Sequence, residues 1–192
     1  MFGKALGYEI NGDDRMRFSR KNFRPAQQGD LDGFCGVYAL FHFFCRRLDV
    51  NPHDDEAKLI FKRLLELIED QGKLTSMRVV DGFLEGQLQK AFNKYAKEKQ
   101  IPVKARRLEI FANRIGAKSI FEVITNFADD EAAMIHMDDC DHWVLAHSGT
   151  AKQFYIDDSS EAPETMRIRA AAIVQYDIGL KHGLVFQNAQ TH

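Results

Sequence analysis

Residues 33–48 read Gly-Phe-Cys-Gly-Val-Tyr-Ala-Leu-Phe-His-Phe-Phe-Cys-Arg-Arg-Leu, and this stretch decides the fold. Its apolar side chains cover every side of a helical wheel. A helix that is apolar all round lies buried in the centre of a globular domain. With about 16 residues it is too short for a membrane span, which needs about 20. The stretch therefore predicts a buried central helix.

Around this helix the sequence places helices first and strands afterwards. Periodic apolar positions predict further helices at about 54–72, 81–99 and 119–127. Short apolar runs predict strands at about 101–108, 132–137, 142–147, 152–158, 166–174 and 184–187, with residues 148–150 as a tight connection. This order predicts an α+β fold, in which N-terminal helices, including the central one, pack on a C-terminal antiparallel sheet built from local hairpins.

Composition narrows the class of protein. The 192 residues suffice for one domain spanning 1–192, and 45% of them are apolar. The net charge of −2 favours neither nucleic acid nor acidic substrates as partners, and the basic run around Lys104 is expected to be a solvated strand face. No apolar stretch is long enough to span a membrane, and no secretory signal is visible, so a cytoplasmic location is expected, although export as an effector stays open.

The cysteines point to a reducing environment and to reactive thiol chemistry. There are three, Cys35, Cys45 and Cys140, and their number and spacing fit neither a disulfide framework nor a zinc site, so no cofactor is expected. Cys35 stands where a glycine-containing loop enters the central helix. A helix N-terminus lowers the pKa of a thiol placed there, and the thiolate is the nucleophile. Cys35 is thus a candidate nucleophile, whereas Cys45, inside the helix, is expected to be core.

A histidine and two aspartates supply candidates for the partners of this thiol. His142 opens an apolar strand, and Asp157-Asp158 end the next one. If the two strands form a hairpin, the end of the second lies beside the start of the first. One of the two carboxylates then fixes the tautomer of an imidazole that takes the thiol proton. The pattern predicts a nucleophile, a base and an orienting acid.

These residues resemble the papain-like cysteine protease clan, and are similar to its compact bacterial members, the bacteriocin leader peptidases and type III effector proteases. The resemblance covers residues 28–40, with Cys-Gly-Val-Tyr-Ala-Leu at the helix start, the strand start His142-Trp143-Val144-Leu145, and residues 154–159. It implies a papain-like fold, a protein or peptide substrate, and an oxyanion hole formed by a glutamine side chain and the Cys35 backbone N–H.

The resemblance leaves two assignments open. Gln28 lies seven residues before Cys35, one more than is usual in the clan, so the intervening loop must bulge if Gln28 is the oxyanion donor; Gln27 is farther still. His142 is 15 residues from Asp157 and 16 from Asp158, and either spacing fits. Asp158 is favoured as the orienting acid because Asp158-Ser159 matches an Asn-Ser pair of the clan, with Asp157 second.

Several functions are compatible with this set of residues. A cysteine peptidase acting on peptide or isopeptide bonds through a thioester is favoured. Glutamine deamidation or transglutamination on the same triad is an alternative, and so is a catalytically silent papain-like binding module. A metal site formed by His136, Cys140 and His142, and an interaction protein that uses some of its 15 phenylalanines, are weaker hypotheses. The oligomeric state stays open.

Overall fold

A computed structural model describes residues 25–26, 33–72, 84–128, 130–137, 142–150, 152–159, 166–169 and 179–189. The helices in this part of the chain are α1 (Cys35–Leu48), α2 (Asp55–Glu69), α4 (Glu85–Glu98), α5 (Leu108–Ile115) and α6 (Ile120–Thr125). The strands are β1 (Val103–Arg107), β2 (Ala132–Met137), β3 (His142–Thr150), β4 (Gln153–Asp157), β5 (Met166–Arg169) and β6 (Gly183–Asn188). The α+β class is therefore confirmed.

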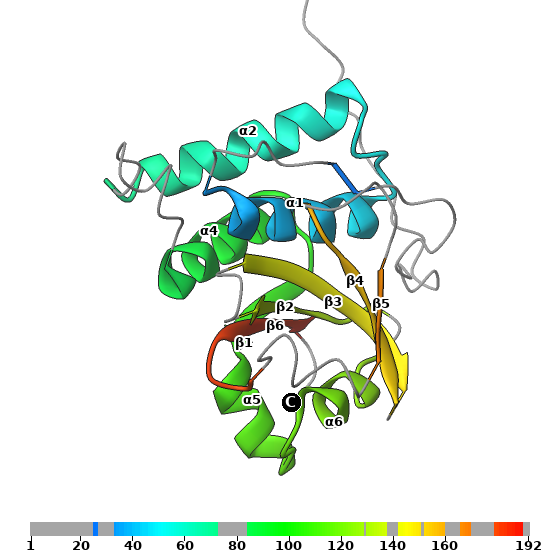
Figure 1. Cartoon of the computed structure of the whole chain (residues 1–192). Helices are drawn as coiled ribbons and strands as arrows, with labels where there is room; N and C mark the ends of the chain where they lie inside the picture. Colours follow the sequence, from blue (N-terminus) through cyan, green and yellow to red (C-terminus); the bar gives the residue numbers. More distant parts are fainter. Residues whose placement is uncertain are drawn as a thin grey trace, which may run out of the picture.

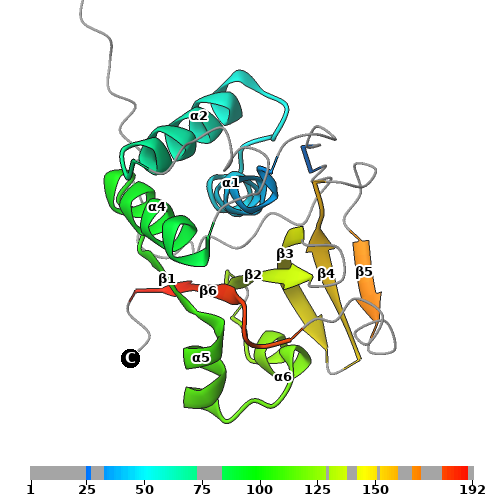
Figure 2. The same cartoon turned by 60° about the vertical axis from the view of Figure 1, so that its left-hand side comes forward.

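Helix α1 is the central helix that the sequence predicts. All of its residues except Tyr38 and Leu48 are buried. It lies between α2 and α4 on one side and the sheet on the other, as Figures 1 and 2 show from two directions. The helix ends at Leu48, where Asp49 adopts a left-handed conformation with φ 53°. The layout that the sequence predicts, a buried helix packed on an antiparallel sheet, is thus present.

The sheet has six strands in the order β1-β6-β2-β3-β4-β5, and every neighbouring pair is antiparallel. Strands β2 to β5 follow one another as local pairs. The expectation of local hairpins throughout is wrong, because β6 inserts between β1 and β2 and pairs with both. Strand β1, which precedes α5, is therefore paired with β6, the last strand described. Such a non-local pairing leaves no periodic signal in the sequence.

The two faces of the sheet are covered by different helices. In β6, Leu184 and Phe186 pack into the cluster that contains α1, α2 and α4, whereas Val185 packs into the cluster that contains α5 and α6. This alternation is the period of two expected of a strand buried on both faces. In Figure 1, α5 and α6 accordingly lie on the side of the sheet opposite α1.

Helix α5 was missing from the sequence-based prediction. Leu108, Phe111 and Ala112 are its buried residues, with the i, i+3, i+4 spacing of a helical stripe. Gly116 follows with φ 69°, the left-handed position that commonly ends a helix. The signal was present but short, because the helix has only 8 residues.

The β3–β4 connection also differs from the prediction. Residues 148–150 belong to β3 rather than to a turn. The pairing register shifts at a bulge between His147 and Gly149, where Ser148 has a positive φ of 35°. A bulge accommodates an extra residue while pairing continues on either side. The pairing Leu145↔Asp157 still brings the end of β4 back toward the start of β3, as the hairpin hypothesis requires.

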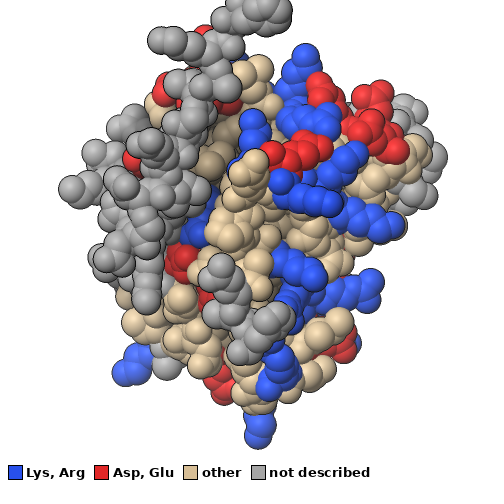
Figure 3. Space-filling model, turned by 180° about the vertical axis from the view of Figure 1, so that it is seen from behind, with Lys and Arg blue, Asp and Glu red and all other residues tan. Residues whose placement is uncertain are grey.

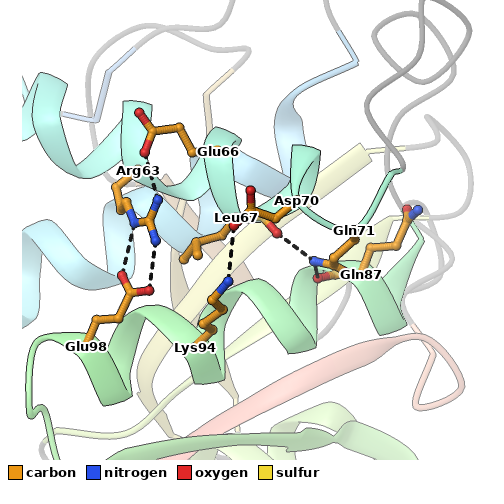
Figure 4. Close-up of polar contacts among 8 residues, drawn as sticks. All are labelled: Arg63, Glu66, Leu67, Asp70, Gln71, Gln87, Lys94 and Glu98. Carbon is orange, nitrogen blue, oxygen red and sulfur yellow. Dashed lines mark hydrogen bonds and ion pairs between the residues drawn. The ribbon is translucent and has the colours of Figure 1, made fainter.

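Ion pairs link α2 to α4 at the surface (Figure 4). Arg63 of α2 donates to both oxygens of Glu98 at 3.0 and 2.8 Å, and it also donates to Glu66 within its own helix at 2.8 Å. Lys94 of α4 reaches Asp70 at 3.1 Å. Exposed pairs of this kind add little to stability, so the packing of α2 and α4 depends on their buried apolar faces.

The face seen from behind in Figure 3 carries many lysines and arginines, interspersed with acidic side chains. Edge strand β1 lies under α4, and two side chains of α4 hydrogen-bond the backbone of Ala105 in this strand. Asn93 accepts from the Ala105 N–H at 2.8 Å, and Gln89 donates to the Ala105 carbonyl at 3.1 Å. Covering an edge strand in this way blocks pairing with another chain.

The contact between sheet and central helix should depend on Phe186. Its ring stacks on Phe92 with centroids 4.2 Å apart and lies 4.7 Å from Phe43, all fully buried. We expect Phe186→Ala to lower the free energy of unfolding in urea by about 3–5 kcal/mol, as large-to-small core substitutions do. The control Leu59→Ala, at a position 67% exposed, should change it far less. Equal effects would contradict this packing.

Candidate active site

Cys35 is the first residue of α1, at the end where the unpaired N–H groups of a helix lie. Phe34 at the N-cap provides no side-chain cap, and the first turn holds no acidic residue. No carboxylate in the first turn of α1 therefore neutralises the positive end of its dipole. Cys35 is only 6% exposed, so its thiol lies at the edge of the core.

His142 is the first residue of β3, and its imidazole is held by Asp158. Nε2 of His142 lies 2.7 Å from Oδ1 of Asp158, and the two side chains are 12% and 5% exposed. Asp158 follows directly on the last residue of β4. The return of the β3–β4 pair therefore brings these two side chains together, at the separation of a charge-assisted hydrogen bond.

The Cys35 thiol also interacts with this imidazole and contributes to its pKa. Burial lowers the pKa of His142, but hydrogen bonds to Asp158 and Cys35 and the charges of both outweigh it and raise this pKa to about 9. The imidazole is thus held in its protonated form at neutral pH, the form that can stabilise a thiolate.

Asp157, the other candidate orienting acid, points to a different partner. Arg46 of α1 donates to its two oxygens at 2.5 and 2.6 Å, and the side chains are 2% and 0% exposed. Nε2 of His147 lies 3.5 Å from the same carboxylate. Although burial raises the pKa of Asp157, His147 and Arg46 outweigh it and hold this pKa well below its usual range. The two adjacent aspartates therefore have separate contacts: Asp158 with His142, and Asp157 with the central helix.

A polar stripe on α1, formed by Cys35, His42 and Arg46, was not anticipated from the sequence. These residues are spaced i, i+7 and i+11, which places them on one face of a helix with 3.6 residues per turn. His42 is fully buried, and its Nε2 accepts a hydrogen bond from the backbone N–H of Ala26 at 3.0 Å. This i, i+7, i+11 spacing is visible in the sequence, but the prediction of a helix that is apolar on every side obscured it.

Gly36 and Trp143 close the apolar side of the helix start. A Cβ on Gly36 would lie 2.6 Å from Cδ1 of Leu88 and 3.4 Å from the Trp143 ring. The missing side chain of Gly36 therefore makes room for α4 and for the strand that carries His142. Gly36 therefore has a packing role at the start of the helix.

The remaining candidate residues are Cys45, Cys140 and the two glutamines. Cys45 is fully buried, as expected of a core residue, and burial raises the pKa of its thiol. Gln27, Gln28 and Cys140 lie outside the described residues.

Within the described part of the chain no cluster of three or more histidine, cysteine or acidic residues could hold a metal ion. In the same part, no helix combines the length and apolarity that crossing a membrane requires.

Comparison with known proteins gave one kind of match. No protein-family model matches the chain, and no curated protein matches it. Among solved structures, the chain is similar to a double glycine motif protease from an AMS/PCAT transporter, determined in complex with the leader peptide. The identity is 16%, the TM-score is 0.46, and the match covers 88% of this chain and 96% of the other.

The pKa of His142 should depend on Asp158. We expect Asp158→Asn to lower it from about 9 toward 6.5 or below, because burial remains while the carboxylate is lost. NMR titration of the imidazole Cε1 proton measures this directly. A raised folded-state pKa stabilises the fold fully below pH 6.5, and the effect is lost as pH rises through 9. The wild type should therefore lose stability relative to Asp158→Asn across this window.

The control for this titration is Asp70→Asn, which removes an exposed carboxylate of the α2–α4 surface. It should leave the titration of His142 unchanged. A midpoint near 6.5 in the wild type, or one that Asp158→Asn does not move, would contradict the coupling of the two side chains.

Breaking the buried Arg46–Asp157 pair should cost more stability than breaking an exposed ion pair. Arg46→Met leaves the Asp157 carboxylate buried without its guanidinium, and breaking a buried pair costs about 3–5 kcal/mol. We expect urea unfolding to show a loss of this order, and the double variant Arg46→Met/Asp157→Leu to recover much of it. Arg63→Met, which removes an exposed pair, serves as the control and should have a much smaller effect. Equal losses in both single variants would contradict the distinction.

Proposed function

We propose that this protein is a papain-like cysteine peptidase with Cys35 as nucleophile, His142 as general base and acid, and Asp158 as the orienting acid. One observation carries the proposal: a single, largely buried imidazole interacts with both a thiol at a helix N-terminus and a carboxylate. A nucleophile bonded to a base that is itself oriented by a third group is the arrangement of acyl-transfer enzymes.

The proposed reaction begins from the thiolate–imidazolium pair. The Cys35 thiolate attacks the carbonyl carbon of a peptide bond and forms a tetrahedral intermediate. The His142 imidazolium gives its proton to the leaving nitrogen, the C–N bond breaks, and a thioester to Cys35 remains. The neutral imidazole then takes a proton from water, whose oxygen attacks the thioester. The acid product leaves, and the thiolate–imidazolium pair is restored.

Two further roles complete the proposal. The backbone N–H of Cys35, at the start of α1, is a candidate donor to the oxyanion, because the first N–H groups of a helix have no partner within it. The resemblance of residues 28–40 to the papain-like clan supports Gln28 as the second donor, with Gln27 as the alternative. Asp157 is proposed to have no part in the chemistry, since its carboxylate is bound to Arg46.

The proposal is tested with a peptide library and mass spectrometry. The wild type should generate new peptide termini, whereas Cys35→Ser should generate none, and hydroxylamine should trap a thioester on Cys35. Cys45→Ser, which alters a core thiol, is the matched control and should retain cleavage if it folds. Deamidated glutamines or glutamine–amine adducts without new termini would reassign the same triad to a deamidase or transglutaminase. The absence of any thioester would favour a catalytically silent binding module.

A further inference from the structure

The search for further function leads to His147, an imidazole of β3 that the proposed peptidase reaction does not use. Its side chain is buried, with 7% exposed. Nδ1 of this ring lies 3.2 Å from the hydroxyl oxygen of Ser148, and Nε2 lies 3.5 Å from Oδ1 of Asp157. A hydroxyl, an imidazole and a carboxylate are thus linked in this order, which is the order of nucleophile, base and orienting acid in serine hydrolases.

The surroundings of the imidazole and the carboxylate fix both groups. The Asp157 side chain is fully buried, and Arg46 donates to both of its oxygens. Although burial raises the pKa of Asp157, His147 and Arg46 hold this pKa well below its usual range. The ring of Tyr155, which pairs with His147 across the two strands, lies nearly parallel to the imidazole with centroids 6.4 Å apart. Asp157 is therefore a charged carboxylate that can stabilise an imidazolium at His147.

The backbone of Ser148 is strained. This residue occupies the bulge of β3 with a φ of 35°, in the left-handed region that residues other than glycine rarely adopt. Neighbouring side chains of a regular strand point to opposite faces of the sheet. The bulge therefore permits the Ser148 hydroxyl to reach the imidazole of the preceding residue. Backbone strain of this kind concentrates at functional sites.

Ser148 also lines a pocket of about 290 Å³, between the end of α6 and the β3–β4 pair. This volume is near the lower end of the range for small-molecule sites. The polar groups around the pocket include those of Thr125, Thr150, Gln153 and Tyr155, and none of the described residues that line it is charged. A small, uncharged substrate such as a short-chain acyl ester fits this lining.

The pocket is separate from the proposed peptidase site. Ser148 lies six residues beyond His142 on β3, which corresponds to about 20 Å of strand. Helix α6 lies on the side of the sheet opposite α1 (Figure 1). We propose that Ser148 is a second nucleophile, activated by His147 and Asp157, which takes the acyl group from a small uncharged ester. This inference goes beyond the proposed peptidase and does not depend on it.

The reaction begins with His147 in the tautomer that carries its hydrogen on Nε2, toward Asp157. Nδ1 takes the Ser148 proton as the hydroxyl oxygen bonds to the ester carbonyl carbon. The Gln153 amide and the Tyr155 hydroxyl are candidate donors to the oxyanion. The imidazolium gives its proton to the leaving alkoxide, the C–O bond breaks, and an acyl ester of Ser148 remains. Water then gives a proton to the imidazole and attacks this ester, the acid leaves, and the proton returns to the Ser148 oxygen.

A fluorophosphonate probe tests this nucleophile, because an activated serine displaces the fluoride and forms a stable phosphonate ester. The probe is applied to the Cys35→Ala protein, which lacks the competing thiol, and the label is located by peptide mass spectrometry. We expect the label on Ser148. Ser148→Gly, which removes the hydroxyl and suits the positive φ, should lose it, and His147→Gln, which lacks the base, should slow labelling about 10²- to 10⁴-fold. Thr150→Ala removes another hydroxyl of the same pocket and is the matched control, which should be labelled as before.

p-Nitrophenyl acetate provides the second readout, since it is a small uncharged ester. The Cys35→Ala protein should release p-nitrophenolate and carry an acetyl group on Ser148, whereas Ser148→Gly in the same background should do neither. The proposal is overturned if Ser148 is labelled no faster than in urea-unfolded protein, or if Thr150→Ala loses as much label as Ser148→Gly. The peptidase proposal is tested separately, because alkylation of Cys35 by iodoacetamide should proceed equally in Ser148→Gly and the wild type.

Discussion

The bidentate ion pair between Arg46 and Asp157 joins the two halves of the site. Arg46 lies on the helix that begins with Cys35, and Asp157 ends the strand that leads into Asp158. The pair therefore ties the helix that begins with Cys35 to the strand that leads into Asp158. A buried ion pair is weak evidence for net stability, because desolvation offsets much of the attraction. Its two hydrogen bonds nevertheless link the helix directly to the strand.

The central helix contributes both to the apolar core and to the candidate site, because its apolar and polar side chains lie on different faces. Its aromatic side chains pack against α2, α4 and β6, and Cys35, His42 and Arg46 form the polar stripe. Each member of the stripe contacts a different segment: His142 for Cys35, Ala26 for His42 and Asp157 for Arg46. Buried polar groups need such partners, since an unpaired one costs about 1–3 kcal/mol. The stripe thus brings together parts of the chain that are far apart in sequence.

Much of this arrangement could be predicted from the sequence. Local patterns predicted α1, α2, α4 and α6 and most strands, because each has a clear apolar period. The hairpin argument also led to His142 and to the aspartate pair. The predicted hairpin could not distinguish Asp157 from Asp158. The distinction depends on Arg46, whose position relative to β4 is set by tertiary packing. The insertion of β6 between β1 and β2 was likewise unpredictable, since strand order is set by long-range packing. Helix α5 and the polar stripe, by contrast, had readable signals that were overlooked.

The central claim is that Cys35 and His142 act as a thiolate–imidazolium pair, and selective alkylation tests it most directly. The purified protein is treated with sub-stoichiometric iodoacetamide over a range of pH, and the label is located by peptide mass spectrometry, with His142→Ala alongside. The account predicts that Cys35 is labelled first, reacts rapidly near neutral pH, and loses that rate in His142→Ala, while buried Cys45 stays unlabelled. Labelling of Cys35 no faster than that of an ordinary thiol, with a pKa of about 8.5, would contradict it, as would a rate indifferent to His142.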